Sequence, residues 1–154
     1  MNTPESVFER VRSMLRNGDS AGLGMVLEEL KSDELTVPVV RVLLSCFEDN
    51  EDLLHEMYGI LHTVERSSPP VVYEATSREF VALESRAPFW AALVVGRLLN
   101  ASIASGDRFD ARAFIERARW HLKDDVWQLF LKVVKGLHSR GKIPAPIGNA
   151  LLDA

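Results

Sequence analysis

The sequence has very little cysteine and no long apolar run. Cys46 is the only cysteine among 154 residues, so the chain cannot form an internal disulfide. No apolar stretch reaches the roughly 18 residues that a membrane-spanning helix needs, and residues 1–6 lack the basic and apolar regions of a signal peptide. These absences predict a cytoplasmic protein, and they predict that Cys46 is a small core residue.

Motifs that carry chemistry are also scarce. The chain has no glycine-rich phosphate loop and no Gly-x-Ser-x-Gly turn. His55 and Glu56 begin like a zinc-protease helix, but that motif needs a histidine where Gly59 stands. His55 and His62 share a helix face, yet two histidines without a third ligand make a weak metal site. The sequence therefore predicts no catalytic residue, no metal, no cofactor and no enzymatic activity. The alternative is an enzyme whose active site is assembled from residues distant in the sequence.

What the chain does have is the composition of a globular protein and a helical pattern. Hydrophobic residues make up 47% of it and charged residues 26%. This composition predicts one helical domain over residues 1–154, with residues 142–154 as a short C-terminal extension. Helix caps and apolar spacing predict eight helices, which begin near residues 4, 20, 36, 51, 69, 88, 111 and 124. Residues 37–44 are rich in β-branched side chains, so a strand is the alternative there.

The spacing of these helices indicates the architecture. Taken in pairs, the openings at residues 4, 36, 69 and 111 are separated by about 30 to 40 residues, the scale of two-helix solenoid repeats. The predicted fold is all-α, with antiparallel helix pairs stacked as a short HEAT-like α-solenoid. No repeat consensus is visible, so an irregular helical bundle is the alternative.

Residues 88–100 form the predicted central helix. Pro88 suits its first turn and Asn100 suits its end. The residues between them are apolar on every side except for Arg97, which predicts a helix buried all round. A buried guanidinium needs an acid, and Glu65 is the candidate partner. We favour this structural pair, because an isolated buried arginine is costly; the alternative is that Glu65 and Arg97 both face a groove and contact a ligand.

Two predictions concern helix starts in the last third of the chain. Asp110 is expected to cap the seventh helix, with a hydrophobic staple between Phe109 and Phe114. Asp124 or Asp125 is expected to cap the eighth helix.

Charge is unevenly distributed along the chain. Residues 1–66 carry 13 acids and 6 bases, whereas residues 67–154 carry 9 acids and 12 bases, and the net charge is −4. One acidic run, which contains no base, consists of Glu48, Asp49, Glu51, Asp52 and Glu56. Acids are favourable near a helix N-terminus, and the alternative is a negative patch that steers a basic protein partner. These five residues are the predicted partner-binding residues.

A contrasting basic stretch consists of Arg112, Arg117, Arg119 and Lys123. With Trp120 beside it, nucleic-acid binding is the alternative, but a single mixed-charge helix in an acidic protein is weak support. We expect no direct contact with nucleic acid, and we expect Trp120 and Trp127 to fill the core between the seventh and eighth helices. Residues 143–147 are expected to form an extended link before a short closing turn.

Two groups of residues stand in the middle of the chain. They are Tyr58, Gly59, Ile60, Leu61, His62 and Glu65, followed by Ala87, Pro88, Phe89, Trp90, Ala91, Gly96, Arg97, Leu98, Leu99 and Asn100. The segment that they span resembles a family of bacterial immunity proteins from polymorphic toxin systems, the group catalogued as immunity protein thirty. The resemblance implies a helical, HEAT-like protein that binds its cognate toxin domain and neutralises it by stoichiometric occlusion. It transfers no contact residue to this chain.

The predicted function is therefore that of an immunity protein. Its expected partner is the C-terminal domain of a bacterial toxin, such as a basic nuclease delivered by a contact-dependent or polymorphic-toxin system. The chain is expected to be a monomer alone, to bind the toxin one-to-one, and to involve no membrane. The alternative is an α-solenoid scaffold or regulatory protein that binds another protein partner.

Overall fold

The computed structural model describes residues 2–31, 34–104, 116 and 118–153. These residues contain helices and no strand, so the predicted all-α fold is confirmed and the alternative of a strand over residues 37–44 is wrong. The helices are α1 (Pro4–Asn17), α2 (Ser20–Glu29), α3 (Val37–Ser45), the 3-10 helix η1 (Glu51–Leu53), α4 (Leu54–Glu65), α5 (Pro69–Arg86), α6 (Pro88–Ala104), α8 (Asp124–Ser139) and α9 (Ala145–Leu152).

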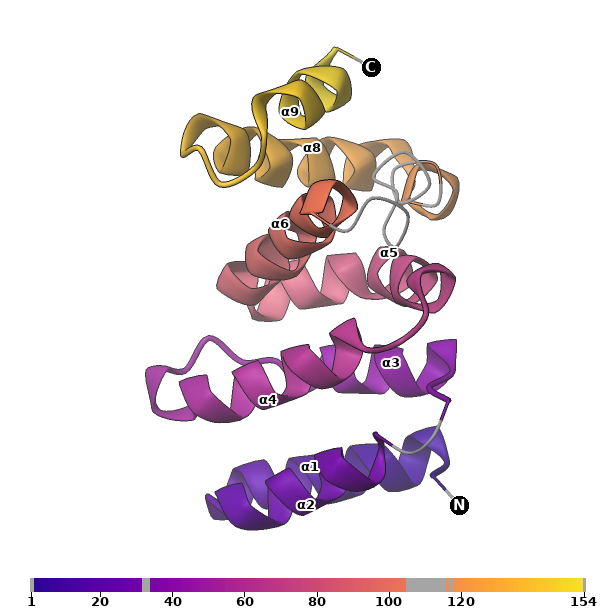
Figure 1. Ribbon diagram of the computed structural model, residues 1–154, viewed down its shortest axis with the longest axis vertical. Coiled ribbons are helices and arrows are strands. Elements are labelled where there is room, and N and C mark those ends of the chain that lie inside the picture. The colour runs from indigo at the N-terminus through magenta and orange to yellow at the C-terminus, as the bar shows by residue number, and fades with distance from the viewer. Residues whose placement is uncertain (1, 32–33, 105–115, 117, 154) are drawn as a thin grey trace.

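The helices stack in pairs along the long axis of the molecule (Figure 1). α1 packs against α2, α3 against α4, α5 against α6, and α8 against α9. α1, α3 and α5 also pack one on the next, and α6 packs on α8. Because each pair contacts mainly the pairs beside it, the arrangement is that of a short α-solenoid. α1 and α9 lie at opposite ends of the stack (Figure 1).

Local sequence signals explain where most of these helices begin and end. Thr3, Asp19 and Asn50 each accept a hydrogen bond from a backbone N–H in the first turn of the helix that follows. Gly18 and Gly141 follow the last turns of α1 and α8 with φ of 63°. This left-handed conformation is one that glycine adopts without a steric penalty, so both glycines suit the end of a helix.

Three predictions about where helices begin or end are wrong. α6 continues to Ala104, because Asn100 stays helical and its side-chain amide donates to the Lys142 carbonyl at 2.8 Å. Lys123 occupies the N-cap position of α8, and the two aspartates that follow it lie in the first turn, where acids suit the helix dipole. Residues 145–152 are helical, because proline in the first turn of α9 favours a helix start.

The predictions for Asp110, Phe109 and Phe114 lie outside the described residues.

A hydrophobic core runs through the stack. Cys46 and Trp127 belong to it, as predicted. Trp120, however, is 85% exposed, so its predicted place in the core is wrong. Ala118 and Leu122, four residues apart on one helix face, are the buried residues there, and a side chain midway between them points to the opposite side. In the described part of the chain, no helix combines the length and apolar character needed to cross a bilayer.

Candidate protein interface

The central helix α6 is apolar all round but is buried on one side only. Trp90, Val94 and Val95 are at most 2% exposed and face the core. Phe89 lies on the opposite side and is 54% exposed, and Leu93, one turn further on, is only partly buried. The prediction of a helix buried all round is therefore wrong. α6 packs on α5 and α8, and these neighbours leave one face of it uncovered.

Phe89 stands between two hollows on this uncovered face. The first has a volume of about 500 Å³ and is lined by Asp49, Asn50, Glu51, Leu54, Phe89 and Trp90. The second has a volume of about 620 Å³; we call it the α6–α8 groove. Its apolar lining consists of Pro88, Phe89, Ala92, Leu93, Gly96 and Leu137, and its polar lining of Arg97, Asn100, Arg140 and Lys142. Acidic side chains line the first hollow, and basic side chains line the second.

The first hollow is built on an aromatic cluster around Trp90. The Trp90 ring stacks on Phe47 with 5.0 Å between ring centroids, and it meets Tyr58 and Phe89 edge-on at 5.1 and 5.3 Å. Asp49 accepts a hydrogen bond from the Phe89 N–H at 3.0 Å. The Asp49 carboxylate therefore caps the start of α6, where a negative charge suits the helix dipole, and it fixes Phe89 in place.

The α6–α8 groove is possible because α6 and α8 approach closely at Gly96. A Cβ atom on Gly96 would lie 3.4 Å from the Leu137 side chain, so an alanine would just contact it and little space remains for a longer side chain. At the far end of the groove, the hydrogen bond from Asn100 to the Lys142 carbonyl ties α6 to the turn after α8. These contacts hold the two walls of the groove at a fixed distance.

Arg97 and Glu65 form the contact that the sequence predicts, between α6 and α4. Arg97 Nη2 donates to Glu65 Oε2 at 2.8 Å, and Arg97 Nε donates to the other carboxylate oxygen. The hydrogen bonds from Arg97 to Glu65 raise the pKa of the guanidinium above its ordinary value. His62 lies 3.4 Å from the same carboxylate. Because both groups are partly exposed, with side-chain exposures of 41% for Arg97 and 24% for Glu65, the pair lies at the edge of the groove rather than in the core.

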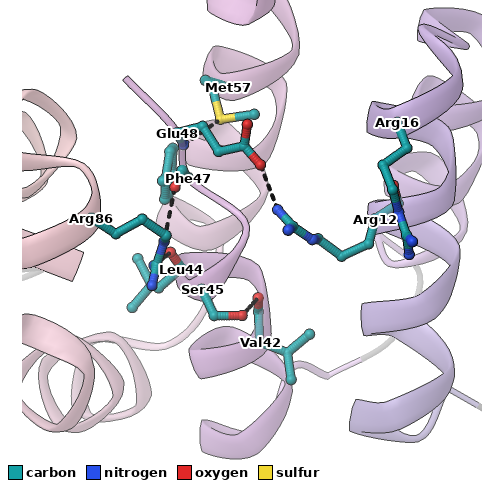
Figure 2. Close-up of polar contacts among 9 residues, drawn as sticks. All are labelled: Arg12, Arg16, Val42, Leu44, Ser45, Phe47, Glu48, Met57 and Arg86. Atoms are coloured by element: carbon teal, nitrogen blue, oxygen red, sulfur yellow. Dashed lines mark hydrogen bonds and ion pairs between the residues drawn. The ribbon is translucent and has the colours of Figure 1, made fainter. Parts of the chain in front are cut away.

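The five residues of the acidic run do not form one patch of equivalent carboxylates. Glu48 bonds to Arg12 of α1 at 2.5 Å, as Figure 2 shows. Glu56 accepts a hydrogen bond from Ser20, and this bond lowers the pKa of Glu56 below its ordinary value. Asp49 caps α6. Glu51 and Asp52 are exposed side chains in the turn before α4, and they are the members of the run best placed to meet a partner.

The turn that carries Glu48 and Asp49 is held from the other side as well. Arg86 of α5 donates to the carbonyls of Phe47 and Leu44 at 3.1 and 3.2 Å (Figure 2). These bonds add donors to carbonyls at the C-terminal end of α3, where the regular helical hydrogen bonding stops. The acidic edge of the first hollow is thus anchored by arginines from α1 and α5.

Two observations on the described residues concern metal binding and the thiol of Cys46. Over residues 2–31, 34–104, 116 and 118–153, no group of three or more histidine, cysteine or acidic side chains could hold a metal ion. Burial raises the pKa of the Cys46 thiol to about 11, which keeps it protonated and unreactive. Of the basic stretch, Arg112 and Arg117 lie outside the described residues, while the Arg119 guanidinium lies 5.6 Å from the centre of the Trp127 ring.

Sequence reasoning does not identify the three residues that give this face its character. The all-round apolar pattern of residues 88–100 predicts that Phe89 is buried, and no local signal marks it as exposed. Arg140 and Lys142 lie near the end of the predicted eighth helix, where the sequence indicates only that cations suit the helix dipole. Their position beside α6 depends on how α8 packs, which no local pattern reports.

Comparison with models of protein families, with curated proteins and with solved structures finds no match for this chain. The resemblance to the immunity protein thirty family, and the function that it implies, stay predictions.

Proposed function

We propose that this chain is an immunity protein that binds a cognate bacterial toxin domain one-to-one and neutralises it by occlusion in the cytoplasm. The toxin domain is the C-terminal part of a larger secreted protein, such as a basic nuclease delivered by a contact-dependent or polymorphic-toxin system. The chain contributes no chemistry of its own: its surface covers the toxin's active site or substrate path. The resemblance of residues 58–100 to immunity protein thirty supports this proposal.

The observation that carries the proposal is the uncovered face of α6, with Phe89 at its centre. Phe89 is 54% exposed although it stands beside two hollows that an incoming side chain could fill. Exposed aromatic anchors surrounded by hollows are typical of the residues that dominate binding energy in protein interfaces. Because Asp49 and the aromatic cluster hold Phe89 in place, little conformational entropy is lost when a partner covers it.

Charge beside Phe89 favours a basic partner at this end of the face. Asp49 and Glu51 line the first hollow, and none of its other described lining residues is basic. An arginine or lysine of the partner would find aromatic surface and two carboxylates there, which together attract a cation. A nuclease that binds an acidic substrate has basic residues around its active site, so covering that site with this hollow would be electrostatically favourable.

The experiment that tests the proposal has two stages. The chain is used as bait in its native host, and captured proteins are identified by mass spectrometry. The captured toxin domain is then expressed in a sensitive strain with the chain, with Phe89→Ala, or with Met25→Ala. Met25 is 69% exposed on α2 and lines neither hollow, so it is the matched control.

We expect Phe89→Ala to weaken toxin binding by about 2 kcal/mol, or about 30-fold in Kd, and to reduce protection. The Met25→Ala variant should protect as the unchanged chain does. Capture of a housekeeping complex in place of a toxin would favour the alternative, a scaffold or regulatory protein. Equal protection by the two variants would show that the toxin binds elsewhere.

A further inference from the structure

We infer that the α6–α8 groove binds an acidic amphipathic segment of a protein partner. The apolar side chains of this segment would lie on α6, and its carboxylates would lie beside Arg140 and Lys142. This inference deepens the proposed function and shares with it one requirement, that the chain binds a protein partner. The bound segment need not belong to a toxin.

The shape of the groove fits a short length of polypeptide. Its floor follows α6 from Phe89 to Asn100, and eleven residues of helix span about 17 Å. That is the length of about three helical turns, or of five residues of extended chain. The groove is open to solvent along one side, whereas sites for small molecules are concave and enclose most of the ligand.

The groove is apolar at one end and positive at the other. Pro88, Phe89 and Leu93 line the end nearest the first turn of α6, while Arg140 and Lys142 line the end nearest Asn100. Among the lining residues that the structure describes, none is acidic. A ligand that matches this surface has apolar side chains at one end and negative charge at the other.

The two cations at the far end are available to a ligand. Among the described residues, neither Arg140 nor Lys142 forms an ion pair, and both are exposed. Arg97, the third basic residue of the lining, is different because Glu65 already matches its charge. The C-terminal dipole of α8 offsets only about half a unit charge, so the end of the groove keeps most of two positive charges.

A protein segment fits these features better than a nucleic acid does. Nucleic acids need a track of several cations along the phosphate backbone, together with exposed aromatic faces for stacking. Here the two available cations lie at one end, and Phe89 is the one aromatic residue among the lining residues that the structure describes. Arg97 is already paired with Glu65, so it adds no further available cation. An amphipathic helix with leucine-like side chains and flanking glutamates matches the aliphatic floor and the cationic end at once.

The test uses two labelled helical peptides of 14 residues that share one leucine stripe. One peptide carries glutamate at its flanking positions and the other carries lysine. Binding to the full chain is followed by fluorescence anisotropy, and the site is identified from NMR shifts of the Ala92 and Leu93 methyl groups. The variants are Arg140→Glu/Lys142→Glu and, to remove charge without reversing it, Arg140→Gln/Lys142→Gln.

The matched control is Lys132→Glu/Lys135→Glu, which makes the same charge change on exposed positions of α8 that do not line the groove. Circular dichroism establishes that all three variants are folded. A short single-stranded DNA of matched charge serves as the competing ligand.

We expect the glutamate peptide to bind about tenfold more tightly than the lysine peptide at low salt, and to shift the Ala92 and Leu93 signals. The glutamine variant should remove this preference and the glutamate variant should reverse it, while the control should keep it within about twofold. The inference is overturned by equal affinities for the two peptides, by equal effects of the groove and control variants, by no binding at about 1 mM peptide, or by tighter binding of the DNA.

Because the peptides replace the toxin, the outcome is separate from that of the proposed function. Failure of the peptide test leaves the immunity proposal standing on Phe89 and the first hollow. Failure to capture a toxin does not affect the groove, which could bind an acidic segment of a different protein.

Discussion

Removing the ion pair between Arg97 and Glu65 distinguishes a structural role from a ligand-binding role. The perturbation is a double-mutant cycle that consists of Arg97→Met, Glu65→Gln and the double variant. Methionine keeps most of the apolar stem of arginine, so the packing of α6 against α4 changes little. The cycle therefore isolates the interaction between the two charged groups.

The structure sets the expected size of that interaction. Exposed ion pairs contribute about 0.2–1 kcal/mol, and two parallel hydrogen bonds place this pair toward the upper end. The Arg97 side chain is 41% exposed, so solvent screens the pair and the 3–5 kcal/mol typical of breaking a buried pair does not apply. We expect a coupling of about 0.5–1 kcal/mol and, for a chain of this length, a loss in Tm of about 1–4 °C for Arg97→Met.

The assay is urea denaturation of the four proteins, followed by measurement of their binding to the captured partner. A structural pair gives the expected coupling energy, and the double variant, which leaves neither charge unmatched beside the groove, binds the partner to within about twofold of the unchanged chain, since Phe89 remains. Zero coupling together with unchanged stability and lost partner binding would refute the structural role. A coupling above about 3 kcal/mol would refute the argument that solvent screens the pair.

Three further predictions follow from burial and charge. Burial raises the pKa of the Cys46 thiol from 9.0 to about 11, so the thiol contributes a constant amount to stability below pH 9. Between pH 9 and 11 the unfolded chain loses that proton first, and urea denaturation should show stability falling by up to about 1.4 kcal/mol per pH unit, a slope absent in Cys46→Ala. Trp90→Ala should cost about 3–5 kcal/mol in the same assay, because Trp90 is 1% exposed and touches three aromatic rings; a cost below 1 kcal/mol would contradict the packing. Glu51→Lys/Asp52→Lys should slow association with a basic partner and reduce its salt dependence in stopped-flow measurements, without altering stability, and unchanged kinetics would remove these two residues from the interface.

The helices could be predicted from the sequence because their signals are local. Thr3, Asp19 and Asn50 cap the helices that follow them wherever those helices pack, and Gly18 ends α1 through its own backbone conformation. The failures near α8 and α9 have the same origin. Aspartates can cap a helix or occupy its first turn, and proline can follow an extended link or start a helix, so the local pattern allowed both choices.

The acidic run shows that residues close together in the sequence can have different roles in the tertiary structure. Five acids in nine residues suggest one surface, yet Glu48 bonds to Arg12, Asp49 caps α6 and Glu56 bonds to Ser20. The partners come from α1, α6 and α2, which are distant in sequence. Glu51 and Asp52 are exposed, and Asp49 is exposed as well although its carboxylate caps α6. These different roles could be learned only from the fold.

The uncovered face of α6 is the feature that the sequence was least able to reveal. An apolar residue has the same hydrophobicity whether a helix of its own chain or a partner covers it, so an all-round apolar helix indicates burial without saying by what. Phe89 and Trp90 are adjacent aromatic residues in the sequence, but one is 54% exposed and the other 1%. The Trp90 ring is covered by Phe47, which follows α3, and by Tyr58 of α4, and both come from segments distant in sequence. A helix that a monomer leaves half-covered, yet that has the composition of a core, has the surface that a protein partner would complete.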